Sequence, residues 1–142
     1  MPTKNKKKSP RGELAIRTLA MPSDANPDGD IFGGWVLSQM DIAGGLISKK
    51  LAEGRTVTVA IDSMTFHKPV SIGDVLCCFV ELVKIGNTSL TMAVEAWASR
   101  QYRNEFIRVT EGKFVYVAID KKQKPRLLPN SLRKQKAGQA SI

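Results

Sequence analysis

Hydrophobic and polar positions follow two different periods along this chain, and the change of period divides it into predicted elements. Residues 14–21 form a short, mostly apolar run that predicts a strand, and Pro22 ends it. The polar residues 23–30 are rich in Asp, Asn, Pro and Gly, which is typical of a loop. Residues 32–51 contain no proline, and their apolar side chains cover nearly the whole circumference of a helix. We therefore expect a long helix that is buried on most sides and ended by Gly54.

Beyond that helix the pattern changes to the period of β-strands. The predicted strands are residues 56–62, 75–83, 90–97 and 109–119. Gly86 and Asn87 lie between the second and third of them and predict a hairpin, because both residue types tolerate positive φ. With no second helix available for parallel crossovers, neighbouring strands are expected to pair antiparallel. The predicted fold class is α+β, with one antiparallel sheet of about five strands wrapped around one long central helix.

The length and composition of the chain fit one packed domain. It has 142 residues, of which 42% are hydrophobic. No apolar run approaches the ~20 residues of a membrane helix, and the lysine-rich start lacks the apolar segment of a signal peptide. The neighbouring Cys77 and Cys78 point to opposite faces of their predicted strand, which argues against a disulfide and for a reducing, cytoplasmic location. One histidine, His67, and no Cys-x-x-Cys pair give no zinc site of the usual spacing.

The net charge of +9 is concentrated at the two ends of the chain. Residues 1–12 carry five basic side chains and residues 121–142 carry seven, and neither segment contains an acid. The segment between them has 10 basic and 13 acidic residues, and therefore a net charge of −3. Such tails can add weak attraction for anions, but they do not make the domain a specific nucleic-acid binder. The predicted division is a disordered basic tail over residues 1–11, a domain over 12–129 and a disordered basic tail over 130–142.

Asp41 is the feature of the predicted helix that most needs an explanation. It lies roughly two turns inside an apolar segment, whereas a carboxylate is almost never fully buried unless it is paired or functional. Gly44 and Gly45 follow at i+3 and i+4, and interior glycines cost on the order of 1 kcal/mol each relative to alanine. This combination favours a cleft in which a ligand approaches the carboxylate. The alternative is an exposed Asp on a partly solvated face, with both glycines serving the packing of helix against sheet.

Gly33 and Gly34 mark the predicted start of the same helix. The first backbone N–H groups of a helix have no intrahelical partner, and the helix dipole is positive at this end. Glycine would let a substrate carbonyl approach these groups without a Cβ in the way, as an oxyanion site for acyl transfer requires. The alternative is that the two glycines only relieve a tight turn between loop and helix.

Four segments of the chain together resemble the signature of one enzyme family. They are MPSDANPDGDIFGGWVLSQMD at 21–41, TFHKPVSIGD at 65–74, GNTS at 86–89 and KPRLLP at 124–129. In this register the chain is similar to the YciA-type acyl-CoA thioesterases over roughly residues 12–129. The resemblance implies the hotdog fold and a cytosolic hydrolase of acyl-CoA esters. It also implies homodimers that assemble further, commonly to hexamers as trimers of dimers.

The resemblance extends to individual residues. Asp41 matches the catalytic aspartate of the family, and Asn26 matches an asparagine that completes the site from the partner subunit. Gly34, preceded by Gly33, falls where a backbone N–H polarises the thioester carbonyl. Candidates for lining the CoA tunnel between subunits are Phe66, His67, Lys68, Thr88 and Ser89. CoA is part of the substrate and product in such a reaction, so neither a separate cofactor nor a metal is expected.

Two mechanisms and two other functions stay open at the level of the sequence. Asp41 could act as general base on a water held with help from Asn26, or attack the thioester directly through an anhydride. A non-catalytic sensor or carrier of acyl-CoA could share the fold, although the pair of Asn26 and Asp41 favours an enzyme. Nucleic-acid binding could reside in the basic tails alone. A lone His67 next to a proline-containing turn is also compatible with a strand-end residue that has no chemical role.

Overall fold

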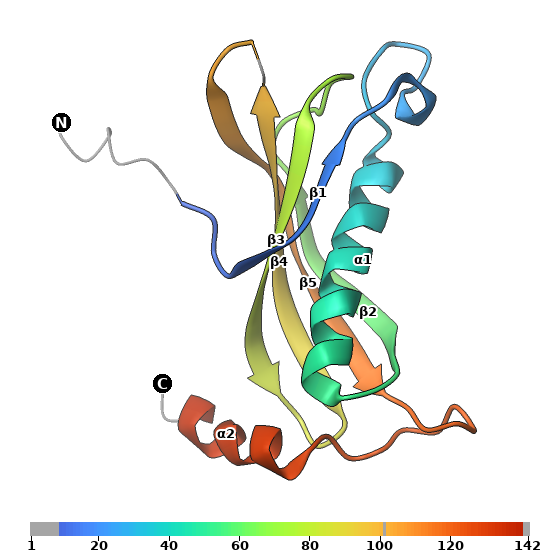
Figure 1. The fold of residues 1–142 in the computed structure, drawn as a ribbon, viewed down its shortest axis with the longest axis vertical. Helices are drawn as coiled ribbons and strands as arrows, with labels where there is room; N and C mark the ends of the chain where they lie inside the picture. The colour runs from blue at the N-terminus through green and yellow to red at the C-terminus, as the bar shows by residue number, and fades with distance from the viewer. Residues whose placement is uncertain (1–8, 101, 141–142) are drawn as a thin grey trace, which may run out of the picture.

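A long helix lies across one face of a five-stranded antiparallel sheet, and a shorter helix lies at one end of it (Figure 1). The structure, a computed structural model, describes residues 9–100 and 102–140. In chain order the elements are β1 (Glu13–Leu19), the 3-10 turn η2 (Pro22–Asp24), α1 (Gly33–Ala52), β2 (Thr56–Phe66), β3 (Val75–Ile85), β4 (Ser89–Arg100), β5 (Glu105–Ala118) and α2 (Asn130–Ala140). The predicted α+β class is confirmed, and the bounds of α1 differ from the prediction by one residue at each end.

The strand order β1-β3-β4-β5-β2 places the two strands that flank α1 in sequence at the two edges of the sheet. β1 pairs with β3, β2 pairs with β5, and all neighbours run antiparallel. The chain therefore crosses the whole width of the sheet between β1 and β2, and α1 makes this crossing. Because of that path α1 contacts all five strands, as expected for a helix around which the sheet wraps.

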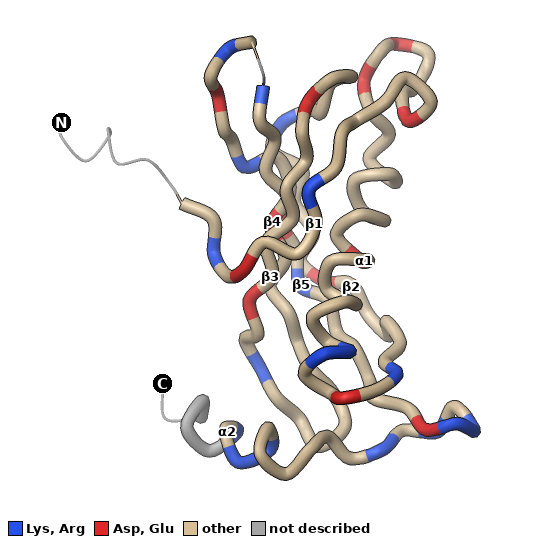
Figure 2. Tube along the Cα trace, in the orientation of Figure 1, with Lys and Arg blue, Asp and Glu red and all other residues tan. Residues whose placement is uncertain are grey.

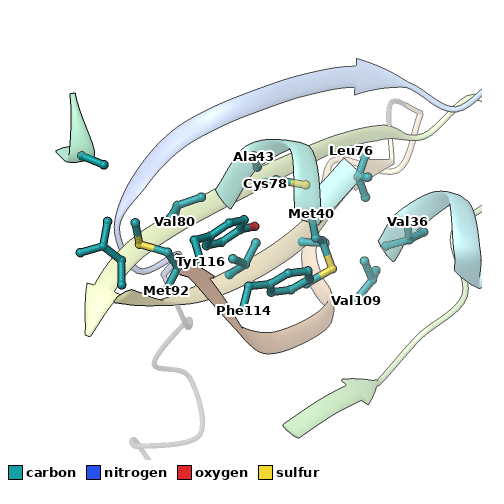
Figure 3. Close-up of a cluster of buried hydrophobic side chains, with 14 of the residues drawn as sticks. Val36, Met40, Ala43, Leu76, Cys78, Val80, Met92, Val109, Phe114 and Tyr116 are labelled. Carbon is teal, nitrogen blue, oxygen red and sulfur yellow. The ribbon is translucent and has the colours of Figure 1, made fainter. Parts of the chain in front are cut away.

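The core lies between α1 and the sheet, and Figure 3 shows its side chains. The buried face of α1 includes Val36, Met40 and Ala43, which recur at the spacing of one helix face. The expectation that α1 is buried on most sides is wrong for a single chain, since Ile42 is 50% exposed and Leu46 is 52% exposed. One sheet can cover only one side of a helix.

The edge strand β2 exposes apolar side chains as well. Its exposed apolar members include Val57, Val59 and Ile61, and only its first residue is buried. Ile42 and Leu46 of α1 are exposed as well, and we call these five exposed apolar residues the α1–β2 face. Exposed apolar residues on an edge strand and on the helix beside it usually bind another molecule or another chain.

The predicted hairpin between β3 and β4 is confirmed, with Ile85 paired to Leu90. The reason given for it is wrong, because neither Gly86 nor Asn87 has positive φ. A Cβ on Gly86 would lie 2.5 Å from Oγ of Ser89, a contact that rotation of the serine side chain could relieve.

The C-terminal segment differs from the disorder expected for residues 130–142. It forms α2 over Asn130–Ala140, with Leu132 buried against the body of the protein and the Arg133 Nε donating to the carbonyl of Leu128 at 2.8 Å. Disorder was expected from charge alone, whereas a buried leucine and an arginine bonded to the preceding loop hold this helix against the protein. Residues 1–8 and 141–142 lie outside the described residues, and the division at residues 12 and 129 stays a prediction.

Figure 2 shows one group of basic residues at the end of the molecule that carries α2. They lie in the loop after β5, in α2 and in the last turn of α1, whereas the loop before α1 at the opposite end carries acidic residues. Arg126 in the first of these segments is structural, since its Nη2 donates to the carbonyl of Ala52 at 3.0 Å and its Nε to that of Ile119 at 3.1 Å. It therefore caps the C-terminal end of α1. None of the helices among the described residues has the length and apolar character needed to cross a membrane.

Candidate functional site

Asp41 lies half-buried in the middle of α1, and two strands supply hydrogen-bond donors to its carboxylate. Oγ1 of Thr58, on β2, donates to Oδ1 at 2.6 Å. The hydroxyl of Tyr116, on β5, lies 3.1 Å from the same Oδ1 and 3.0 Å from the backbone carbonyl oxygen of Asp41. Thr58 and Tyr116 are cross-strand partners in the β2–β5 pairing, so the sheet register places both donors side by side.

The two oxygens of the Asp41 carboxylate have different surroundings. Oδ1 accepts from two hydroxyl groups, while none of the described residues donates to Oδ2. A carboxylate held in this way presents one oxygen whose lone pairs remain available. Burial raises the pKa of Tyr116 above its ordinary range, and the neighbouring Asp41 charge raises it further. Its hydroxyl is therefore neutral, and it acts as a donor and not as a base.

Gly44 makes room for Tyr116 and not for a ligand. A Cβ on Gly44 would lie 2.2 Å from the Tyr116 hydroxyl oxygen, closer than any real contact. A Cβ on Gly45 would meet only ordinary contacts, with the Lys49 Nζ at 3.6 Å and the Tyr116 ring at 3.9 Å. The interpretation that the glycines open a substrate cleft is thus wrong for Gly44, and the alternative of helix–sheet packing holds for it.

The N-terminal end of α1 is open, as the two glycines at its start suggested. Helix α1 begins at Gly33, and no side chain within the part of the chain that the structure describes caps this end. A Cβ on Gly34 would meet nothing within 4 Å, and one on Gly33 would meet only the ring of Phe66, at 3.5 Å. The first N–H groups of α1 therefore lie beside Phe66 and are not covered by a capping side chain.

Asn26 holds the loop that leads into α1. Its Oδ1 accepts from the backbone N–H of Asp28 at 2.9 Å and from that of Asp30 at 3.1 Å. The loop is tied to the segment after β2 by the backbone N–H of Ile31, which donates to the Val70 carbonyl at 2.9 Å. The side-chain oxygen of Asn26 is thus engaged in loop structure, and its amide nitrogen is the part left for other contacts.

The candidates for CoA contacts fall into two groups at opposite ends of the sheet. Phe66 pairs with Thr110 of β5, whereas Ser89 pairs with Val117 of the same strand. Seven residues of extended chain separate these positions, or about 24 Å. One chain therefore does not bring Phe66, His67 and Lys68 together with Thr88 and Ser89.

A hollow of about 710 Å³ lies at the end of the sheet that carries His67 and Lys68. Its lining is His67, Lys68, Trp97, Asn104, Glu105, Phe106, Ile107 and Arg108. Nε2 of His67 lies 2.6 Å from Oε2 of Glu111, and Nη2 of Arg108 lies 3.3 Å from the same atom. His67 is therefore held by an acidic partner, and the hollow combines charged side chains of both signs with an aromatic wall. Asp41 is not among its lining residues.

The sequence reasoning found Asp41 but missed Thr58 and Tyr116. Both residues were placed in predicted strands, and nothing in the local pattern distinguishes them from other strand residues. A tyrosine on the core-facing side of a strand does require a partner for its hydroxyl, which was the one available signal. No cluster of His, Cys, Asp or Glu that could hold a metal ion occurs in residues 9–100 and 102–140.

Comparison with known proteins gives concordant matches. The Thioesterase superfamily model matches residues 28–103. The Acyl-CoA thioester hydrolase YciA of Salmonella typhimurium is 49% identical over 124 residues, which cover 85% of this chain and 93% of the relative. The crystal structure of a hexameric thioesterase from Yersinia pestis is 52% identical and superimposes with a TM-score of 0.83, covering 86% of this chain and 99% of that one. A hexameric hotdog fold thioesterase of Campylobacter jejuni is 39% identical with a TM-score of 0.83, covering 89% and 97% of the two chains.

Proposed function

The chain belongs to the YciA-type acyl-CoA thioester hydrolases of the Thioesterase superfamily, and on that basis we propose that Asp41 activates water for the hydrolysis of acyl-CoA. The products are a carboxylic acid and free CoA. The observation that carries the role of Asp41 is its environment: a carboxylate in the middle of α1, with Oδ1 held by two donors and Oδ2 left to accept a proton. The expected setting is cytoplasmic.

The proposed reaction requires little beyond a positioned water and an oxyanion donor. Oδ2 of Asp41 takes a proton from a water molecule while the oxygen of that water attacks the thioester carbon. Negative charge then develops on the carbonyl oxygen of the thioester. The uncapped N–H groups near Gly34 at the start of α1 suit that charge. The tetrahedral intermediate then collapses and the C–S bond breaks. The CoA sulfur leaves with the proton that Asp41 took from water, which restores the carboxylate. Direct attack by Asp41 through an anhydride is the second mechanism that the same geometry permits.

These groups cannot act on one thioester within a single chain. Asp41 follows Gly34 by seven residues, so the two are separated by about 10 Å along the axis of α1. A reacting carbon needs its base and its oxyanion donor each within about 3 Å. We therefore assign Gly34 and Asn26 of one chain, and Asp41 of its partner, to the same site. The α1–β2 face is the surface of the chain that is suited to pack against a second copy, and the solved relatives named above are hexameric.

The same pairing of two chains would also bring the two groups of candidate CoA contacts close to each other. Antiparallel pairing of two copies brings one end of one sheet close to the opposite end of the other. Phe66, His67 and Lys68 of one chain then approach Thr88 and Ser89 of the partner, and we assign them to the CoA tunnel. The ammonium group of Lys68, which lines the hollow, is suited to the phosphates of the nucleotide, and reversing its charge with Lys68→Glu should raise KM more than it lowers kcat.

The test is the release of CoA from acyl-CoA esters of increasing chain length, followed with a thiol-reactive dye. Cys77 and Cys78 do not disturb this assay, because they are 3% and 0% exposed and burial raises the pKa of the Cys78 thiol to about 12. We expect the wild type to release CoA at many turnovers per chain. Asp41→Ala should remove turnover in a folded protein, whereas Glu13→Ala, which removes an exposed acid of β1, should not. Near-full hydrolysis by Asp41→Ala would refute the role of Asp41, and binding of acyl-CoA without turnover by the wild type would indicate a sensor or carrier.

A further inference from the structure

We propose that Tyr116 is a positioning residue for the hydrolysis, because its hydroxyl fixes the Asp41 carboxylate with Oδ1 turned inward and Oδ2 turned toward the reacting water. This inference rests on the proposed function and adds a residue that supports the proposed base of the same site. Tyr116 is buried and its hydroxyl contacts Asp41, so we expect it to act through the aspartate.

The hydroxyl of Tyr116 bridges the main chain and the side chain of one residue. It lies 3.0 Å from the backbone carbonyl oxygen of Asp41 and 3.1 Å from Oδ1 of the same residue. A single hydroxyl proton shared between these two acceptors keeps Oδ1 on the side of α1 that faces β5. The rotation of the carboxylate about its side-chain bonds is thereby restricted.

The tyrosine itself is held rigidly. It is 1% exposed, and its ring lies parallel to that of Phe114, at 6.4 Å between centroids and 12° between planes. Figure 3 shows the ring among the core side chains beneath the turn of α1 that carries Ala43. Gly44, in that same turn, leaves the space that the hydroxyl occupies. A donor on a rigid, packed side chain is the kind of support that keeps a catalytic group in its productive geometry.

The hydroxyl cannot replace Asp41 as the base. Its proton stays bound because burial and the neighbouring carboxylate both oppose ionisation. The other donor to Oδ1 is Thr58, at 2.6 Å, and it comes from an edge strand whose side chains are mostly exposed in a single chain. Tyr116 is thus the more deeply anchored of the two donors. Without it, the carboxylate is free to turn about the remaining hydrogen bond.

The experiment compares Tyr116→Phe with Tyr102→Phe. The second variant removes the hydroxyl of the other tyrosine of the chain, which is fully exposed. Tyr116→Phe keeps the ring and removes only the donor. We expect kcat for CoA release to fall about 10- to 100-fold, with KM within about twofold of the wild type, because a misplaced catalytic group lowers the rate and not the affinity. Tyr102→Phe should match the wild type in both constants.

A second comparison separates positioning from a structural role. In an Asp41→Asn background the added change Tyr116→Phe should not lower the residual rate further, since no carboxylate remains to be oriented. A purely structural effect would lower the rate by the same factor in both backgrounds. Should Tyr116→Phe be less stable than the wild type, both comparisons are made at a temperature at which circular dichroism shows every variant to be folded.

The outcomes distinguish this inference from the proposed function. Hydrolysis by the wild type with an unchanged kcat in Tyr116→Phe would refute the role of Tyr116 alone. A loss confined to KM, or an equal loss in the Asp41→Asn background, would refute it as well. Absence of CoA release by the wild type would refute the proposed function and this inference with it.

Discussion

The two neighbouring glycines of α1 should respond in opposite ways to the same substitution. Alanine at Gly44 would place a methyl group 2.2 Å from the Tyr116 hydroxyl oxygen and 2.8 Å from the ring carbon that carries it. Alanine at Gly45 would have its nearest contacts at 3.6 and 3.9 Å, which are ordinary distances. Both glycines are buried and both lie inside the helix, so the pair isolates the effect of close packing.

The expected magnitudes follow from opposing contributions. Replacing a glycine in a helix interior by alanine stabilises a protein by about 1 kcal/mol through helix propensity. At Gly44 an overpacking cost at the upper end of about 1–3 kcal/mol opposes this gain, and loss of the hydrogen bond from Tyr116 to a charged acceptor adds about 1.5 kcal/mol. We expect Gly44→Ala to lower the free energy of unfolding by about 3.5 kcal/mol, and Gly45→Ala to raise it by up to about 1 kcal/mol.

Thermal unfolding followed by circular dichroism tests this, with all variants at one protein concentration so that any association of chains affects them equally. For a chain of this size we expect a midpoint roughly 10 °C lower for Gly44→Ala and slightly higher for Gly45→Ala. CoA release should fall in the first variant and stay unchanged in the second. Equal shifts of the two midpoints, or a stabilising Gly44→Ala, would refute the packing of Tyr116 against α1.

Three further predictions concern stability. Since the pKa of the buried Cys78 thiol is raised from 9.0 to about 12, the folded protein keeps a proton that the unfolded chain loses, so stability should fall as pH rises from about 9. In urea unfolding, the free energy of unfolding should decline by up to about 1.4 kcal/mol per pH unit above pH 9. The decline should be steeper above pH 10, where Tyr116 ionises only in the unfolded chain. In Cys78→Ala the decline between pH 9 and 10 should be smaller. Arg126→Met should destabilise by about 1–3 kcal/mol in urea unfolding through loss of the cap on α1, whereas Lys124→Met, at an exposed position, should change stability by less than about 0.5 kcal/mol. Leu132→Ala should lower the free energy of unfolding by about 2 kcal/mol and increase amide hydrogen exchange in α2. An unchanged exchange rate would show that this leucine does not hold the helix in place.

The secondary structure followed closely from the sequence because it depends on local patterns. The apolar run of residues 32–51 gave α1 to within one residue at each end, and the alternating runs gave every strand after it. Asp41 stood out because a carboxylate in an apolar helix conflicts with its surroundings. Where a rule was applied without its tertiary context the prediction was wrong: charge alone suggested disorder for the segment that forms α2, and positive φ was invoked for Gly86.

What the sequence alone determined is the order and type of the elements, the position of the unusual carboxylate and the motifs that the family shares. Only the tertiary structure decided which groups surround that carboxylate, because Thr58 and Tyr116 lie 17 and 75 residues from Asp41 along the chain. Strand alternation tells which side chains share a face, but it does not specify which residue of β2 lies opposite which residue of β5. That register, with its irregularity after Thr58, brings both hydroxyl groups to one oxygen of Asp41. The same register explains why position 44 is a glycine, because Tyr116, which lies far along the chain, fills the space that a side chain there would need.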